Sequence, residues 1–94
     1  MFEIRFDEGG SIELSGRLDA AESPKAKLFL EGVSRSAVVD FAKLQYISSA
    51  GLGVLFAAQK RLMVSGAGLK LVHLNPHIRE VFQIAGFDTI FDME

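Results

Sequence analysis

Two neighbouring serines, Ser48 and Ser49, are the residues of this chain whose type and setting best suggest chemistry. The apolar spacing that follows them predicts a helix beginning at one of the two. The first turn of a helix has unpaired backbone N–H groups and carries about half a positive charge. A serine hydroxyl at that point is well placed to accept a phosphate, which adds about −1.5 to −2 charges. Phosphorylation is therefore the chemistry that this segment most clearly predicts.

Helix capping is the competing interpretation, because serine is a common N-cap residue. Judged from the residues alone, capping is favoured over phosphorylation. The two roles are compatible if Ser48 caps the helix and Ser49 accepts the phosphate. A phosphate at an exposed helix start is favoured by only about 0.3–1 kcal/mol, so we expect it to change partner binding and leave the fold intact.

The elements that must position these serines follow from hydrophobic periodicity. We expect strands at 2–6, 11–15, 37–40, 69–74 and 87–91, the last a short edge strand, and helices that begin near 23, 48 and 75. Their order, β-β-α-β-α-β-α-β, predicts an α/β fold with a mixed sheet of four to five strands and about three helices. A length of 94 residues fits one domain, assigned to 1–94.

The predicted helices have recognisable starts and faces. Ser23 and Asn75 are each followed by proline, the signature of a capping residue before the first helical position. The inner face of the middle helix is expected to hold Leu52, Leu55, Phe56, Leu62 and Met63. Its outer face is expected to hold Ala50, Val54, Ala57, Ala58, Arg61 and Ser65. Small residues there would let a partner approach closely, although alanine is also simply a good helix former.

The predicted strands also place polar groups together. If the strands at 11–15, 37–40 and 69–74 are parallel, their carboxyl ends share one edge of the sheet, where open α/β sheets commonly bind ligands and partners. Asp19, Asp40, Asn75 and the two serines are expected at that edge.

Composition narrows the function classes. The net charge is −2 and the basic residues are scattered, which argues against nucleic-acid binding. There is no cysteine, His73 and His77 lack further ligands at zinc spacing, and the serines lack a histidine base at a recognisable spacing. The longest apolar run, 52–58, is too short to span a bilayer. We expect a cytoplasmic binding protein without metal, cofactor, enzymatic activity or direct membrane insertion.

Several motifs carry a family resemblance. The segment from Val38 to Leu55, centred on Tyr46-Ile47-Ser48-Ser49-Ala50-Gly51-Leu52-Gly53, resembles the signature of bacterial anti-sigma-factor antagonists, which are STAS domains. Gly16-Arg17-Leu18-Asp19 resembles the earlier Gly-x-Leu-Asp element of that family. Asn75-Pro76 and Ile84-Ala85-Gly86-Phe87 fit its later segments, so the resemblance covers nearly the whole chain.

The resemblance implies a partner-switching cycle. An unphosphorylated antagonist binds an anti-sigma factor that is also a serine kinase of the GHKL type, the kinase ends this binding by phosphorylating it, and a PP2C-type phosphatase reverses the step. The implied acceptor is Ser49, two residues before the first glycine of Gly-Leu-Gly, and a rival acceptor is removed because Ala50 stands where the family often has Ser or Thr. The predicted partner-binding residues are Asp19, Asp40, Ser48, Ala50, Gly51, Gly53, Val54 and Ala58.

Within this set, Asp19 and Asp40 are expected to flank the acceptor, while Gly51 and Gly53 are expected to keep the approach open. Two alternatives stay open. The chain could be the STAS subunit of a lipid-transport or anion-transporter system, in which the serine is structural. It could also be a STAS module that senses a nucleotide near Asp40 or Ser49.

Overall fold

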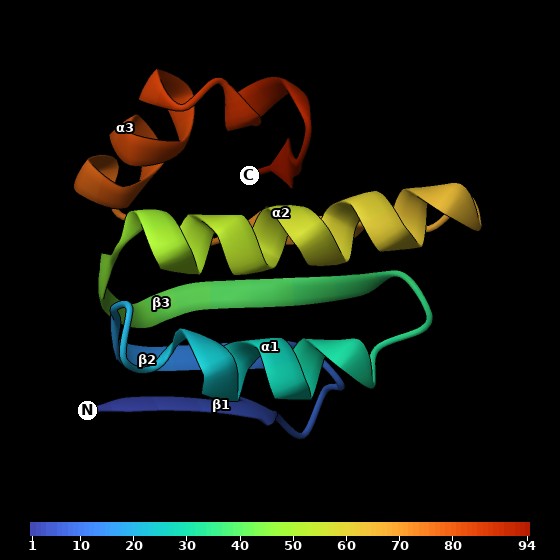
Figure 1. Ribbon diagram of the computed structural model, residues 1–94, viewed down its shortest axis with the longest axis horizontal. Helices are drawn as coiled ribbons and strands as arrows, with labels where there is room; N and C mark the ends of the chain where they lie inside the picture. Colours follow the sequence, from blue (N-terminus) through green and yellow to red (C-terminus); the bar gives the residue numbers. More distant parts are fainter.

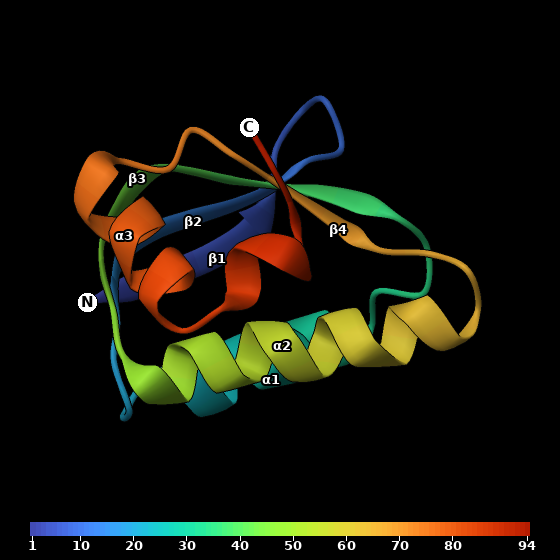
Figure 2. The ribbon, with the colours of Figure 1, turned by 90° about the horizontal axis from the view of Figure 1, so that it is seen from above.

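All helices of the computed structural model, which describes residues 1–94, lie against one face of a five-stranded sheet (Figures 1 and 2). The strands are β1 (Phe2–Phe6), β2 (Ile12–Leu18), β3 (Ala37–Ile47), β4 (Leu69–Val72) and β5 (Asp92–Met93). The helices are α1 (Ser23–Glu31), α2 (Ser49–Val64), α3 (Pro76–Ile84) and the 3-10 turn η1 (Phe87–Thr89). The predicted α/β fold and its β-β-α-β-α-β-α-β order are confirmed.

The order of the strands explains why the helices share a face. It runs β1-β2-β3-β4-β5 in space as in sequence, with β1 antiparallel to β2 and the other neighbours parallel. Each crossover therefore steps to the next strand in the same direction. Right-handed crossovers that always step the same way place their helices on the same side of a sheet. The opposite face of the sheet stays uncovered.

Burial along the strands follows this one-sided arrangement. Ile12 and Leu14 of β2 are buried toward the helices, whereas Glu13, between them, keeps part of its surface in solvent. Phe41 of β3 meets Phe82 of α3 edge to face, with ring centres 5.8 Å apart. Edge-to-face packing of buried rings is a favourable aromatic geometry. The third helix is thereby fixed to the same core as the first two.

The strand predicted at 37–40 is much longer than expected, because β3 continues to Ile47. Its pairing with β2 shifts register twice, and each time the extra residue lies on β3. As a result the buried residues Phe41, Leu44 and Ile47 are three apart along the strand. Bulges of this kind hide the two-residue alternation that identifies a strand in sequence.

The C-terminal third differs from the prediction at two places. β4 ends at Val72, short of 74, because His73 has a φ of 60°, in the left-handed region that interrupts a strand. The edge strand expected at 87–91 is instead the 3-10 turn η1, and the last strand is the short β5 that follows it.

Two expectations for the helices are also wrong. Ser23 does not cap α1, because Glu22 is at the N-cap position and the Ser23 hydroxyl donates to the carbonyl of Asp19 at 2.8 Å. Met63 is 55% exposed because it faces away from the core, whereas Leu62 in the same turn is buried. Phe56, only partly buried, stacks on Phe87 with ring centres 4.9 Å apart. Even α2, the longest helix at 16 residues, is shorter than a bilayer-spanning helix.

Candidate functional site

The start of α2 is fixed by Ser48. Its side-chain oxygen accepts a hydrogen bond from the N–H of Gly51 at 3.1 Å, and its carbonyl accepts one from the N–H of Leu52 at 2.9 Å. Its own N–H donates to the carbonyl of Leu18, at the end of β2, at 2.9 Å. The predicted capping role of Ser48 is confirmed, and the cap joins the helix start to the sheet.

Ser49 is the first residue of α2 and is exposed. Its hydroxyl therefore lies in solvent at the positive end of a helix that Ser48 already caps. A transferase could reach this oxygen without unfolding any element. The geometry is compatible with the predicted phosphate acceptor, which stays a prediction.

A groove of about 390 Å³ runs between α1 and α2, which are in contact along the helical side of the sheet (Figure 1); seen from above, α1 lies behind α2 (Figure 2). Its α2 side is formed by Ala50, Gly53, Val54, Ala57, Ala58 and Arg61, and its α1 side by Lys27, Leu30 and Glu31. Four of the residues predicted to bind a partner, Ala50, Gly53, Val54 and Ala58, thus line one surface. Because small residues form the α2 wall, a partner side chain can approach the helix backbone.

The sequence analysis did not predict that residues of α1 line this groove. Lys27 and Glu31 are four residues apart and exposed, a spacing that places them on one side of a helix but does not say which element they face. The two helices also change the expectation for Ala58, which is only 7% exposed and forms the floor of the groove. Ala58 was expected to be an outer-face residue, and that expectation is wrong.

Arg61 holds one end of the groove closed. Its guanidinium donates to the carbonyls of Leu30 and Val33, both at 2.8 Å. These carbonyls lie at the C-terminal end of α1, where the helix dipole favours a positive charge. The contact fixes α1 against α2 and so keeps the groove in shape.

The two glycines near the start of α2 do different things. Gly51 is buried, and a Cβ added there would lie 2.8 Å from Cγ of Leu18 and 3.0 Å from Cγ1 of Ile47. It therefore lets α2 pack closely on the sheet, and the expectation that Gly51 keeps the outer surface open is wrong. A Cβ added at Gly53 would meet nothing within 4 Å, so at this position the surface is indeed open.

The two aspartates, expected together, lie in different places. Asp19 follows the end of β2, next to the Leu18 carbonyl that binds the N–H of Ser48, and its carboxylate accepts from the N–H of Glu22 at 3.0 Å. Asp40 lies inside β3, and the strand from there to Ile47 covers roughly 20 Å at about 3.3 Å per residue. The structure brings Asp19 to the serines, and the expectation that Asp40 flanks Ser49 is wrong.

Asn75 also lies away from the serines. It follows β4, whose last residue, Val72, is level with Asp40 in the sheet. Its side chain accepts a hydrogen bond from the N–H of Ile78 at 2.8 Å, so its predicted capping role is confirmed. The expected gathering at one sheet edge fails because β3 extends well beyond β4.

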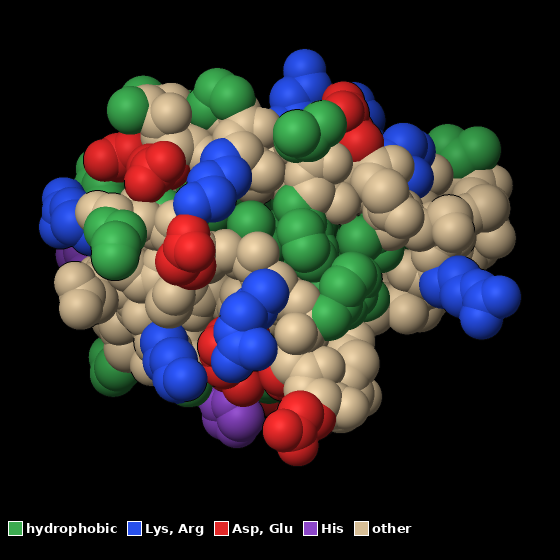
Figure 3. Space-filling model, turned by 90° about the horizontal axis from the view of Figure 1, so that it is seen from below, with side chains coloured by type: hydrophobic (Ala, Val, Ile, Leu, Met, Phe, Trp, Pro, Cys, Tyr) green, Lys and Arg blue, Asp and Glu red, His purple; other side chains and the backbone are tan.

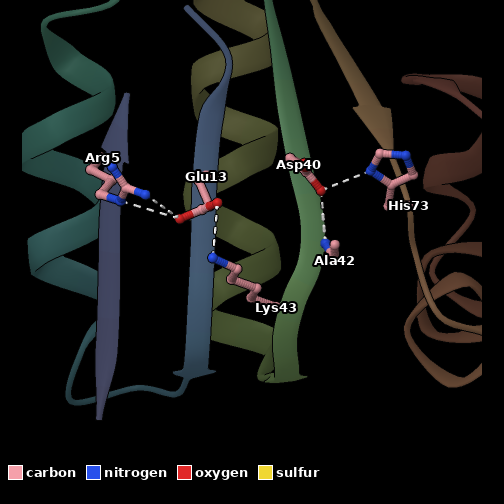
Figure 4. Close-up of polar contacts among 6 residues, drawn as sticks. All are labelled: Arg5, Glu13, Asp40, Ala42, Lys43 and His73. Carbon is pink, nitrogen blue, oxygen red and sulfur yellow. Dashed lines mark hydrogen bonds and ion pairs between the residues drawn. The ribbon is translucent and has the colours of Figure 1, made fainter. Parts of the chain in front are cut away.

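Asp40 lies on the open face of the sheet. Figure 4 looks onto this face, with the helices behind the strands. Its Oδ1 accepts from the N–H of Ala42 at 2.9 Å and lies 3.0 Å from Nδ1 of His73. Partial burial alone would raise the pKa of Asp40, but the hydrogen bonds from Ala42 and His73 hold it below its ordinary value of 3.8. Asp40 is thus occupied by its own chain.

Other charges on this open face are likewise paired within the chain (Figure 4). Glu13 lies between two cations, 3.0 Å from the guanidinium of Arg5 and 3.5 Å from Nζ of Lys43. Further along the sheet, the guanidinium of Arg17 lies over the ring of Tyr46 at 4.3 Å from its centre. The charges of these side chains are paired within the chain. The helical side of the molecule instead carries the open groove between α1 and α2.

Comparison with known proteins gives consistent likenesses. The family model described as Mlab, STAS domain matches residues 4–93. The protein BtrV of Bordetella bronchiseptica, named as a candidate anti-sigma factor antagonist, is 49% identical over 57 residues, which cover 61% of this chain and 49% of BtrV. The matched part of this chain thus spans about half the length of BtrV.

The structural likenesses concern the fold. An anti-sigma factor antagonist from Mycobacterium paratuberculosis is similar with a TM-score of 0.82 and 21% identity, over 99% of this chain and 83% of that one. A candidate antagonist from Thermotoga maritima has a TM-score of 0.80 and 20% identity, over 99% of this chain and 85% of that one. The Bacillus protein SpoIIAA in its phosphorylated form has a TM-score of 0.71 and 18% identity, over 100% of this chain and 91% of that one.

Proposed function

Since this chain belongs to the STAS domain family whose model matches residues 4–93, we propose that it is an anti-sigma-factor antagonist, a binding switch controlled by phosphorylation. The unphosphorylated form binds an anti-sigma factor that is also a GHKL-type serine kinase. Phosphorylation of Ser49 releases this partner, and a PP2C-type phosphatase restores binding. The names of BtrV and of the similar solved structures support this proposal. In this role the chain is a cytoplasmic binding protein and not an enzyme.

One observation carries the proposal: the hydroxyl of Ser49 is exposed while a different residue, Ser48, caps the helix. A phosphate on Ser49 leaves the cap in place, and its interaction with the helix start is favourable by about 0.3–1 kcal/mol. The domain can thus carry the modification without refolding. The unfavourable effect falls on a partner surface, where a desolvated or like-charged contact with the dianion costs several kcal/mol.

The proposed partner surface is the groove between α1 and α2 together with the start of α2. Ala50, next to Ser49, belongs to the groove, so a phosphate on Ser49 lies at its end. The binding residues that we retain are Asp19, Ser48, Ala50, Gly53, Val54 and Ala58. Gly51 and Asp40 are left out because the first is buried under the helix and the second lies elsewhere on the sheet.

The test uses a GHKL-type anti-sigma factor kinase from the same cell with ATP, and locates any added phosphate by peptide mass. The Ser49→Ala variant is expected to bind the kinase and take no phosphate. The Ser49→Asp variant is expected to bind at least about tenfold more weakly, since each factor of ten corresponds to about 1.4 kcal/mol.

Ser34 provides the matched control, because it is also an exposed serine but follows α1 at a distance from the start of α2. Ser34→Ala and Ser34→Asp are expected to behave like the parent protein. Phosphate found on another residue, or full binding by Ser49→Asp, would contradict the assignment.

A second candidate function keeps the surface and changes the partner. The match identifies a STAS domain, and STAS-like domains also serve as subunits of lipid-transport and anion-transporter systems. The kinase experiment separates the two functions. A transport subunit would bind its complex equally well as Ser49→Ala and as Ser49→Asp, and would neither bind nor be modified by the kinase.

A further inference from the structure

The strand β1 lies at an end of the sheet and has a free edge. It is the lowest strand in Figure 1, and Figure 3 views the molecule from that side. Hydrophobic side chains gather near the middle of this view, with Lys, Arg, Asp and Glu side chains around them (Figure 3). The helix-facing side chain of Phe6 is 54% exposed and packs on Phe29 of α1, with ring centres 5.0 Å apart. An exposed edge of this kind can pair with another strand.

The hydrogen bonds to β2 show which backbone groups of β1 point outward. The N–H of Arg17 donates to the carbonyl of Met1, and the N–H of Asp7 to the carbonyl of Ser11, both at 2.8 Å. In an antiparallel pair, alternate residues bond to the neighbouring strand, so odd-numbered residues of β1 face β2. The N–H and C=O groups of Phe2, Ile4 and Phe6 consequently point to the free edge.

The side chains of β1 are complementary to a second β1 that runs the other way. With Ile4 opposite its own copy, Phe2 faces Phe6, and Glu3 faces Arg5. The outward N–H and C=O groups of both strands then meet in hydrogen-bonding positions. We propose that two copies of this chain associate through β1 in this register. The contact is isologous, because each copy uses the same surface.

This pairing makes one continuous sheet and leaves the proposed switch surface free. The even-numbered residues of both strands face the same side, so the two helical layers lie on one face of the joined sheet. The groove between α1 and α2 lies on the far side of α1 from the Phe29–Phe6 contact. Each copy can still bind a partner there.

Lys25 competes for the same edge. Its Nζ donates to the carbonyl of Phe2 at 2.8 Å and to Oε1 of Glu3 at 2.5 Å. Charged lysines are a common protection of sheet edges against strand pairing. The association is therefore expected at high protein concentration, and removal of this lysine is expected to strengthen it.

The first test exchanges charges across the proposed contact, with sedimentation equilibrium of the full chain as the measurement. The parent is expected to dimerise, whereas Glu3→Lys alone and Arg5→Glu alone place like charges opposite each other twice. Each variant should associate about tenfold more weakly than the parent. An equimolar mixture of the two variants should recover the parent's association as a heterodimer, because every facing pair is again of opposite charge.

Lys43→Glu is the matched control for Arg5→Glu, because both changes remove a cation from Glu13 but Lys43 lies on β3, away from the edge. It should associate like the parent. A parent that stays monomeric up to about 1 mM, or a mixture no better than its components, would overturn the proposal. Circular dichroism of each variant shows whether it is folded.

The second test reads the register. The chain has no cysteine, and residues that face each other in a hydrogen-bonded antiparallel pair have Cα atoms about 5.5 Å apart, within disulfide range. Ile4→Cys should form a disulfide-linked dimer on mild oxidation, and Ser15→Cys on β2 should not. Lys25→Ala should increase the yield for Ile4→Cys. Equal crosslinking of the two cysteine variants, or a lower yield with Lys25→Ala, would contradict this register.

Discussion

The molecule exposes two large surfaces of opposite character, the groove between α1 and α2 and the open face of the sheet. The α2 wall of the groove is made mostly of small and apolar residues, with the charged side chains of Lys27, Glu31 and Arg61 at its border, and the groove ends beside an exposed serine. The sheet face carries charged side chains that are paired within the chain, such as Glu13 with Arg5 and Lys43. Such exposed ion pairs contribute little to stability, but a partner binding there would have to displace or match them. An exposed apolar surface beside a modifiable group is the better candidate for regulated binding.

Both surfaces follow from the same topology. Since every crossover steps in one direction, the helices cover one face, and neighbouring helices necessarily form grooves between them. The other face receives only the outward side chains of the strands, which are mostly polar because they meet water. The contrast between the surfaces is thus a property of the strand order as much as of individual residues.

The largest expected effect is the loss of stability on substitution of Gly51, which lies between the surface of α2 and the core. Gly51→Ala should destabilise the protein by roughly 2 kcal/mol, because its methyl group would lie 2.8 Å from the Leu18 side chain and α2 would have to shift. Urea denaturation measures this change in the free energy of unfolding.

Gly53→Ala is the matched control, because Gly53 lies on the outer side of the same helix. It should stabilise the fold by about 0.5–1 kcal/mol, because its methyl group meets nothing within 4 Å and alanine favours the helix. Equal effects of the two substitutions would contradict the assignment of Gly51 to packing and Gly53 to the open surface.

A bulky side chain tests the contrast between the two surfaces directly. Ala57→Trp fills the groove and should weaken binding of the anti-sigma factor kinase by about tenfold or more, roughly 1.4 kcal/mol. Ala42→Trp places the same side chain on the exposed sheet face and should leave the affinity unchanged. Isothermal titration of each unphosphorylated variant provides the comparison. A stronger loss for Ala42→Trp would move the partner to the sheet.

The smallest expected effect concerns Asp40 on the sheet face. The negative charge of Asp40 strengthens the hydrogen bonds that its carboxylate accepts, and this charge is expected to stabilise the fold by about 0.5–1 kcal/mol at neutral pH. Because the folded protein lowers the pKa of Asp40 below 3.8, this contribution is complete above about pH 4–5 and is lost as the pH falls through the lowered pKa. Asp40→Asn should lose it at neutral pH, and the difference from the parent should vanish in acid. Thermal denaturation of both proteins at several pH values measures this stability difference. Binding of the kinase should be the same for Asp40→Asn and the parent.

Much of the fold and the start of the site could be predicted from local patterns. The caps at Ser48 and Asn75 depend on neighbouring residues alone, and the exposure of Ser49 follows from its position ahead of the buried helical face. The same is true of the element order. Signals of this kind operate within one turn of helix or one strand.

The failures arise where distant segments meet. The length of β3, and with it the place of Asp40, depends on bulges against β2 that break the alternation. Lys27 and Glu31 join the groove only because α1 packs beside α2, and Gly51 is buried by contacts with Leu18 and Ile47. A single sequence carries no direct record of such pairings.

The division of tasks between Ser48 and Ser49 has a consequence for timing. Because Ser48 holds the backbone and Ser49 carries the proposed phosphate, we expect the two states of the domain to share a single shape. The duration of a signal would then equal the lifetime of one phosphoester, set by the enzymes that make and hydrolyse it. No slow rearrangement of the chain would delay the response or prolong it.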